Sequence, residues 1–134
     1  MGKVMKIVYI FGNPLLPFDS LPLKLVPVLA KKFPGIRFLS IDPNENIKFI
    51  DKKPVIIDTI AGIKKVTVLN DIDKIIFDKI YSAHDLDLGF NLKLLAKLGY
   101  IEKVTIFGVP PGIRREEALK QLYPLIERSF SDID

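Results

Sequence analysis

The sequence contains no cysteine among its 134 residues. A chain without thiols can form neither a disulfide framework nor a thiolate zinc site, and it has no thiol nucleophile. This composition suits a reducing compartment, so we expect a cytoplasmic protein. Nearly half of the residues, 49%, are hydrophobic. A single domain spanning residues 1–134 should therefore bury a core large enough to need no disulfide or structural metal.

Long hydrophobic runs and one-signed charge stripes are also missing. The first apolar run, within MGKVMKIVYIFG, is too short for a membrane span, and no small-residue cleavage site follows it, so we expect no membrane insertion. The net charge of +4 comes from lysine pairs scattered among acidic residues. Because no basic stripe carries interleaved aromatic residues, nucleic-acid binding is not expected.

The spaced glycines of a dinucleotide-binding turn are absent as well. The first apolar run leads into FGNPLLPFDS, which lacks the glycine spacing that brings a helix N-terminus onto a pyrophosphate. What this stretch does contain is a Gly-Asn-Pro turn with an acid beyond it. Gly12 and Asn13 tolerate a sharp turn and Pro14 stiffens the chain. The loop is therefore suited to present Asp19 from a fixed position.

The hydrophobic pattern predicts alternating strands and helices. Apolar, β-branched runs predict strands, most of them buried on both faces, and KVTVLND is suited to a sheet edge. These segments are Val4–Phe11, 36–42 (IRFLSID), 54–60 (PVIIDTI), 65–71 (KVTVLND) and 103–109 (KVTIFGV). We leave open whether Ile72–Tyr81 forms a short strand or an irregular connection.

Helices are predicted between these strands. Ser20 is placed to cap a helix that runs to about Lys32. A second helix is predicted over Asp87–Leu98, and Gly99 ends it. Four leucines form one stripe on this helix: Leu88, Leu92, Leu94 and Leu95. A last helix occupies 112–130, with an interruption expected at Pro124. The predicted fold class is α/β, a three-layer sandwich with a mostly parallel twisted sheet and helices on both faces.

Polar residues follow the ends of the predicted strands. Asp19 lies in the loop after the first strand, Asp58 ends VIID, and His84, the single histidine, precedes a helix. Open α/β sheets bind ligands beyond the carboxyl ends of their strands, so these three side chains are candidates to meet there. Two carboxylates and an imidazole suit nickel, zinc, cobalt or manganese and leave coordination positions open.

Each of these residues also has a simpler interpretation. Aspartates at strand ends often cap helices or form turns. A lone histidine is more often a structural or surface residue than a metal ligand. Asn13 is either a plain turn residue or a hydrogen-bond donor to a bound peptide carbonyl. The arginines of PPGIRREEA, Arg114 and Arg115, fit a substrate carboxylate but more often form solvated helix surface.

Three motifs in sequence order carry a resemblance to a known family. GNPLLPFDS, VIIDTIAG and SAHDLDLGFNLKLLAKLG resemble the motifs of the nickel-iron hydrogenase maturation endopeptidases, at similar separations. The last motif is closer to the formate-hydrogenlyase or membrane-bound hydrogenase branch. The resemblance implies that Asp19, Asp58 and His84 are both the metal-binding and the catalytic residues. Phe18 and Ser20 depart from the family pattern, which usually has an acid and a glycine at these positions.

The resemblance implies a nickel-dependent endopeptidase. It would remove the carboxy-terminal peptide from a hydrogenase large-subunit precursor after nickel insertion, with the nickel supplied by or shared with that substrate. Two alternatives remain. A non-catalytic assembly chaperone would bind the same precursor without cutting it. In a receiver-like signalling domain, Asp58 would accept a phosphoryl group. Such a domain needs a lysine at the end of its last strand, and here that strand ends in FGVPPG, without a lysine.

Overall fold

The fold was obtained as a computed structural model. It describes residues 6–11, 21–41, 49, 51–60, 62–70 and 92–130. Within them the order of elements is β1 (Lys6–Phe11), α1 (Leu21–Lys32), β2 (Ile36–Ile41), β3 (Val55–Thr59), β4 (Thr67–Leu69), β5 (Thr105–Val109) and α4 (Arg115–Phe130). Residues 92–97 form a further helical segment.

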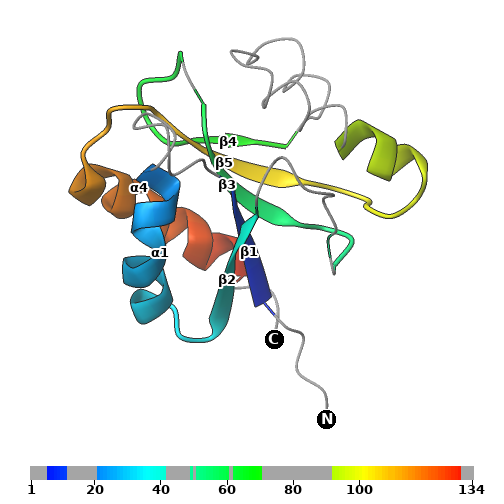
Figure 1. Cartoon of the computed structure of the whole chain (residues 1–134), viewed down its shortest axis with the longest axis horizontal. Helices are drawn as coiled ribbons and strands as arrows, with labels where there is room; N and C mark the ends of the chain where they lie inside the picture. Colours follow the sequence, from blue (N-terminus) through cyan, green and yellow to red (C-terminus); the bar gives the residue numbers. More distant parts are fainter. Residues whose placement is uncertain are drawn as a thin grey trace.

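These strands form one five-stranded sheet in the order β2-β1-β3-β5-β4. The β1–β2, β1–β3 and β3–β5 pairs are parallel, whereas β4 pairs antiparallel with β5 at the edge. Helices cover both faces: α1 and α4 lie on one side, and the helical segment at residues 92–97 lies on the other (Figure 1). The predicted three-layer α/β architecture and the edge position of the KVTVLND strand are therefore confirmed.

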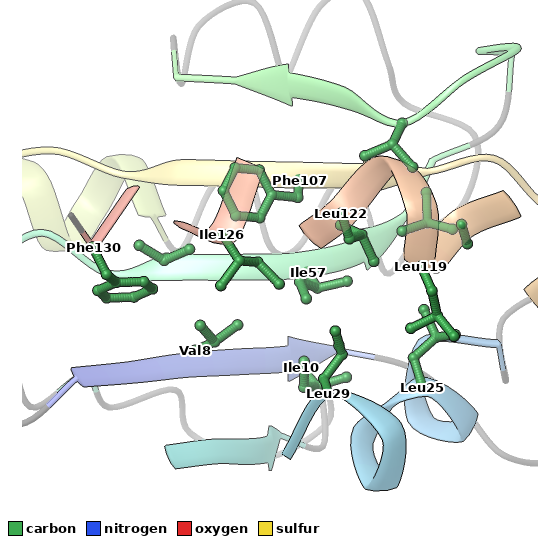
Figure 2. Packing of buried hydrophobic residues seen from close by; sticks show 14 residues of the cluster. Val8, Ile10, Leu25, Leu29, Ile57, Phe107, Leu119, Leu122, Ile126 and Phe130 are labelled. Carbon is green, nitrogen blue, oxygen red and sulfur yellow. The ribbon is translucent and has the colours of Figure 1, made fainter. Parts of the chain in front are cut away.

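The central strands are buried on both faces, as their apolar sequences predict. In β3 all five residues are buried, so its side chains alternate between two hydrophobic clusters. Val55 and Ile57 belong to the cluster under α1 and α4, and Ile56 belongs to the cluster on the opposite face. Figure 2 shows the first cluster, in which Ile57 lies between side chains of the two helices and those of the neighbouring strands.

Two sequence expectations for the helices are wrong. Helix α4 runs without interruption through Pro124, and Pro124 is exposed to solvent. A carbonyl released by a proline on the solvent side can bond to water, so the helix can continue. Leu94 is not part of the buried stripe: it is 54% exposed, whereas Leu92 is fully buried. The predicted positions Ser20 and Asp87 lie outside the described residues.

The end of the third helical segment is as predicted. The N–H of Gly99 donates to the carbonyl of Ala96 at 3.1 Å, and the N–H of Tyr100 donates to the carbonyl of Leu95 at 2.9 Å. These two bonds form a Schellman motif, and Gly99 has the positive φ of 83° that this motif requires. The chain then turns back into β5.

Candidate functional site

Asp58 lies where the strand order reverses. The chain places β2 on one side of β1 and β3 on the other, so β1 and β3 flank the switch point of the sheet. Asp58 is the fourth residue of the five in β3, at its carboxyl end. Ligands of open α/β sheets bind in the crevice outside this point. The prediction that Asp58 lies at the carboxyl end of a buried strand is therefore confirmed.

The carboxylate of Asp58 is held by the backbone of the next residue. Its Oδ1 accepts a hydrogen bond from the N–H of Thr59 at 2.9 Å, and the residue is only 9% exposed. Ile60 donates its N–H to the carbonyl of Val109 in β5 at 3.0 Å. Because successive peptide groups of a strand point to opposite edges, the N–H of Thr59 points toward β1. The paired residues of β1 and β3 end with Ile10 and Ile57, so the Asp58 carboxylate accepts a backbone N–H that lies beyond these pairs.

Hydrocarbon fills the other side of Asp58. Its partner in β5 is Gly108, which has no side chain on the shared face. A Cβ built there would lie 2.7 Å from Cδ1 of Ile60, so the Ile60 side chain occupies this space. Ile60 is 4% exposed and belongs to the cluster on the same face as Asp58. The Ile60 side chain thus occupies the space beside Asp58 toward β5, and the Thr59 N–H holds the carboxylate on the side that faces β1.

The other predicted site residues cannot be placed in the same way. Asn13, Asp19 and His84 lie outside the described residues, so their convergence with Asp58 stays a prediction. Arg114 and Arg115 immediately precede and begin α4, and both are exposed. The side chain of Arg115 lies 4.0 Å from Glu116, in keeping with the interpretation as solvated helix surface.

Two contributions to this region were missed by the sequence reasoning. Thr59 looks like an ordinary β-branched strand residue in VIIDTI, yet its buried hydroxyl has no hydrogen-bond partner within the described ranges. Gly108 looks like a weak point in TIFGV, yet Ile60 needs the space that it leaves. Neither role has a local sequence signal, because both depend on contacts across the sheet.

The same fold occurs in solved structures of known function. The hydrogenase maturating endopeptidase HybD from E. coli superposes with a TM-score of 0.66 and 21% identity, covering 93% of this chain and 94% of HybD. The chain has the fold of the hydrogenase maturation endopeptidases. The solution structure of the endopeptidase HycI from Escherichia coli gives a TM-score of 0.59 and 18% identity, over 95% of this chain and 92% of HycI.

A further solved structure agrees with this fold. The Hydrogenase 3 Maturation protease gives a TM-score of 0.57 and 16% identity, over 98% of this chain and 90% of the protease. No protein-family model and no curated protein matches the sequence. The resemblance inferred from the three motifs is thus confirmed at the level of the fold. Among the described residues, no helix is long and apolar enough to cross a membrane.

The strand arrangement differs from that of a receiver domain. The receiver sheet has the order 2-1-3-4-5 with parallel strands. Here β4 is antiparallel and lies at the edge, beyond β5. The maturation-endopeptidase fold, by contrast, is matched over almost the whole chain. The architecture therefore matches the maturation-endopeptidase fold and differs from that of a receiver domain.

Proposed function

We propose that this protein is an endopeptidase that removes the carboxy-terminal peptide of a [NiFe] hydrogenase large-subunit precursor. The position of Asp58 is the observation that carries the proposal: a buried, hydrogen-bonded carboxylate at the switch point of a sheet with the maturation-endopeptidase fold. We also propose that residues 1–134 form one domain, and that the protein acts in the cytoplasm, where a cysteine-free chain loses nothing to reducing conditions.

The proposed metal-binding residues are Asp58, Asp19 and His84. Two carboxylates and an imidazole are a suitable donor set for nickel. The position of Asp58 fits such a role, because one carboxylate oxygen is fixed by the Thr59 N–H at 2.9 Å and the group is held at the strand end. In this proposal the nickel belongs to the precursor. A precursor without nickel lacks one anchor to the enzyme, which supplies selectivity as a difference in affinity.

The protein side of the reaction requires a positioned base. A carboxylate, Asp58 or Asp19, takes a proton from the attacking water while the water oxygen bonds to the scissile carbonyl carbon. The C–N bond then breaks, and the proton passes to the leaving amine. Bound nickel would supply Lewis-acid polarisation in addition. Asn13 is proposed to donate a hydrogen bond to a substrate carbonyl.

The test compares the masses of a nickel-loaded and a nickel-free large-subunit precursor after incubation with this protein. We expect loss of a defined carboxy-terminal peptide from the nickel-loaded precursor alone. Asp58→Asn should reduce the rate by about 100-fold or more, the usual size of a lost acid–base group. The amide oxygen of asparagine can still accept the Thr59 N–H, so the fold should be preserved.

Asp51→Asn is the matched control. Asp51 accepts a hydrogen bond from the Tyr9 hydroxyl at 3.1 Å, before the start of β3 and away from its carboxyl end. This substitution removes a charge but keeps an acceptor, so processing should continue at the wild-type rate. Stable binding of the nickel-loaded precursor without any change in its mass would instead support the assembly-chaperone alternative. Equal processing by wild type and Asp58→Asn would refute the site assignment.

A further inference from the structure

Thr59 carries a buried hydroxyl that lacks a hydrogen-bond partner among the residues described in the structure. The residue is 8% exposed. Burying a hydroxyl in this way is unfavourable, whereas a valine of nearly the same shape avoids the cost. An unsatisfied polar group in a native structure calls for an explanation, such as a catalytic role or a bound water or ion. The position of this hydroxyl therefore matters.

The hydroxyl lies at the carboxyl end of β3, directly after Asp58. Neighbouring residues of a strand project to opposite faces, so Thr59 lies on the face of Ile57, under α1 and α4, and Asp58 on the other. In Figure 2, Leu25 of α1 and Leu119 of α4 lie beyond the arrowhead of β1, at this same end of the sheet. The Thr59 N–H is bonded to Asp58, whereas the buried hydroxyl has no partner in the part of the chain that the structure describes.

Both covering helices begin at this end of the sheet. Their first turns present N–H groups and the positive ends of the helix dipoles, which favour oxygen acceptors. Arg114 takes the position before α4, and its carbonyl accepts the N–H of Ala118 at 2.9 Å. Arginine has no short side-chain oxygen, so it provides none of the capping that serine or aspartate would give. The end of the sheet that carries the Thr59 hydroxyl is therefore also the end at which both helices begin.

We propose that Thr59 is a substrate-binding residue, whose Oγ–H donates a hydrogen bond to a main-chain carbonyl oxygen of the peptide that is cleaved beside Asp58. This inference rests on the proposed function. A peptide crossing the end of β3 would meet Asp58 on one face of the sheet and Thr59 on the other. A neutral hydroxyl is suited to a neutral carbonyl, which every residue of an extended tail provides. The contact fixes the position of the peptide without reading its sequence.

The experiment measures KM and kcat for nickel-loaded large-subunit precursor with Thr59→Val, Thr59→Ser and wild type. For Thr59→Val we expect KM to rise about three- to tenfold, the effect of one neutral hydrogen bond, with kcat within about twofold. Thr59→Ser keeps the hydroxyl and should retain the wild-type KM. The thermal midpoint of Thr59→Val should equal or exceed that of wild type, because valine leaves no buried polar group unsatisfied.

Thr105→Val is the matched control. Thr105 begins β5 and pairs with Val55, so it lies on the same face of the sheet as Thr59 but at the opposite end. Its KM should stay at the wild-type value. Binding of a synthetic peptide of the precursor tail provides a second readout that needs no turnover. Calorimetry should give a Kd for this peptide that is about three- to tenfold higher for the double variant Asp58→Asn/Thr59→Val than for Asp58→Asn alone.

The outcomes separate this inference from the function on which it rests. Wild-type processing with an unchanged KM and peptide Kd in Thr59→Val would overturn the role of Thr59 and leave the peptidase proposal standing. A lower thermal midpoint for Thr59→Val with an unchanged KM would also overturn it, by giving the hydroxyl a structural role. Absence of processing by wild type would refute the proposed function itself.

Discussion

Gly108 is the residue on which the surroundings of Asp58 depend most directly. Its missing side chain leaves the space that Ile60 fills, and its backbone pairs with Asp58. In Gly108→Ala the new Cβ would lie 2.7 Å from Cδ1 of Ile60. Buried neighbours must shift, so we expect the free energy of unfolding to fall by about 1–3 kcal/mol, measured by denaturant titration.

Ile60→Val removes the clashing Cδ1 and supplies the control for that prediction. Alone, Ile60→Val should lower the free energy of unfolding by about 0.5–1.5 kcal/mol. The double variant with Gly108→Ala should lose less free energy of unfolding than the sum of the two single variants, because the valine makes room for the alanine. Strict additivity would show that the contact between Gly108 and Ile60 does not limit the packing.

Individual residues differ in how far sequence could predict them. Asp58 was predictable, because a single acid ending an apolar run marks the carboxyl end of a buried strand. The lack of a partner for the Thr59 hydroxyl among the described residues was not predictable, because it depends on which groups from other elements cover that position. The close approach of Ile60 to Gly108 was hidden for the same reason: the two residues are distant in sequence and meet only through strand pairing.

At the scale of elements, Gly99 determines how the helical segment at residues 92–97 leads into β5. Gly99 has φ of 83°, a conformation that costs an L-residue about 1 kcal/mol. Gly99→Ala should therefore lower the free energy of unfolding by about 1 kcal/mol. Gly35→Ala is the matched control, because Gly35 also has nothing within 4 Å of a built Cβ but lacks the positive φ. Equal costs for the two variants in denaturant titrations would contradict the role of backbone conformation.

The elements themselves were largely predictable from local patterns. Apolar β-branched runs indicated the central strands, and Gly99 indicated a helix end. The errors arose where solvent exposure decides the outcome. Pro124 does not interrupt α4 because it lies on the exposed side, and Leu94 points away from the core although it has the spacing of a buried residue. The sequence does not show which side of a helix will face water when apolar residues lie on more than one side.

At the scale of the whole molecule, strand order creates the candidate site. The sequence predicts a parallel sheet, but the order β2-β1-β3-β5-β4 is a property of the assembled fold. This order places the switch point between β1 and β3 and so gives Asp58 its significance. The motif resemblance indicated the strand order only indirectly, because it implied the fold of a whole family. Convergence of Asp19 and His84 on Asp58 remains a prediction at this scale.

The two sides of the molecule are connected through β3, and this predicts how mutations in the two clusters combine. Ile56 and Ile57 are both fully buried, but they belong to clusters on opposite faces of the sheet. Ile56→Val and Ile57→Val should each lower the free energy of unfolding by about 0.5–1.5 kcal/mol. Although the residues are adjacent in sequence, their side chains share no packing partners in these clusters, so the double variant should be additive within about 0.5 kcal/mol.

Guanidinium titrations followed by circular dichroism would measure these costs, because the chain contains no tryptophan. A single transition with an unchanged slope is expected in all variants, since both clusters require the same central strands to be formed. A second transition in either variant would mean that one helix layer separates from the sheet independently. A coupling energy above about 1 kcal/mol between Ile56→Val and Ile57→Val would mean that a packing change on one face shifts the backbone of β3. Substitutions on either face would then also alter the position of Asp58.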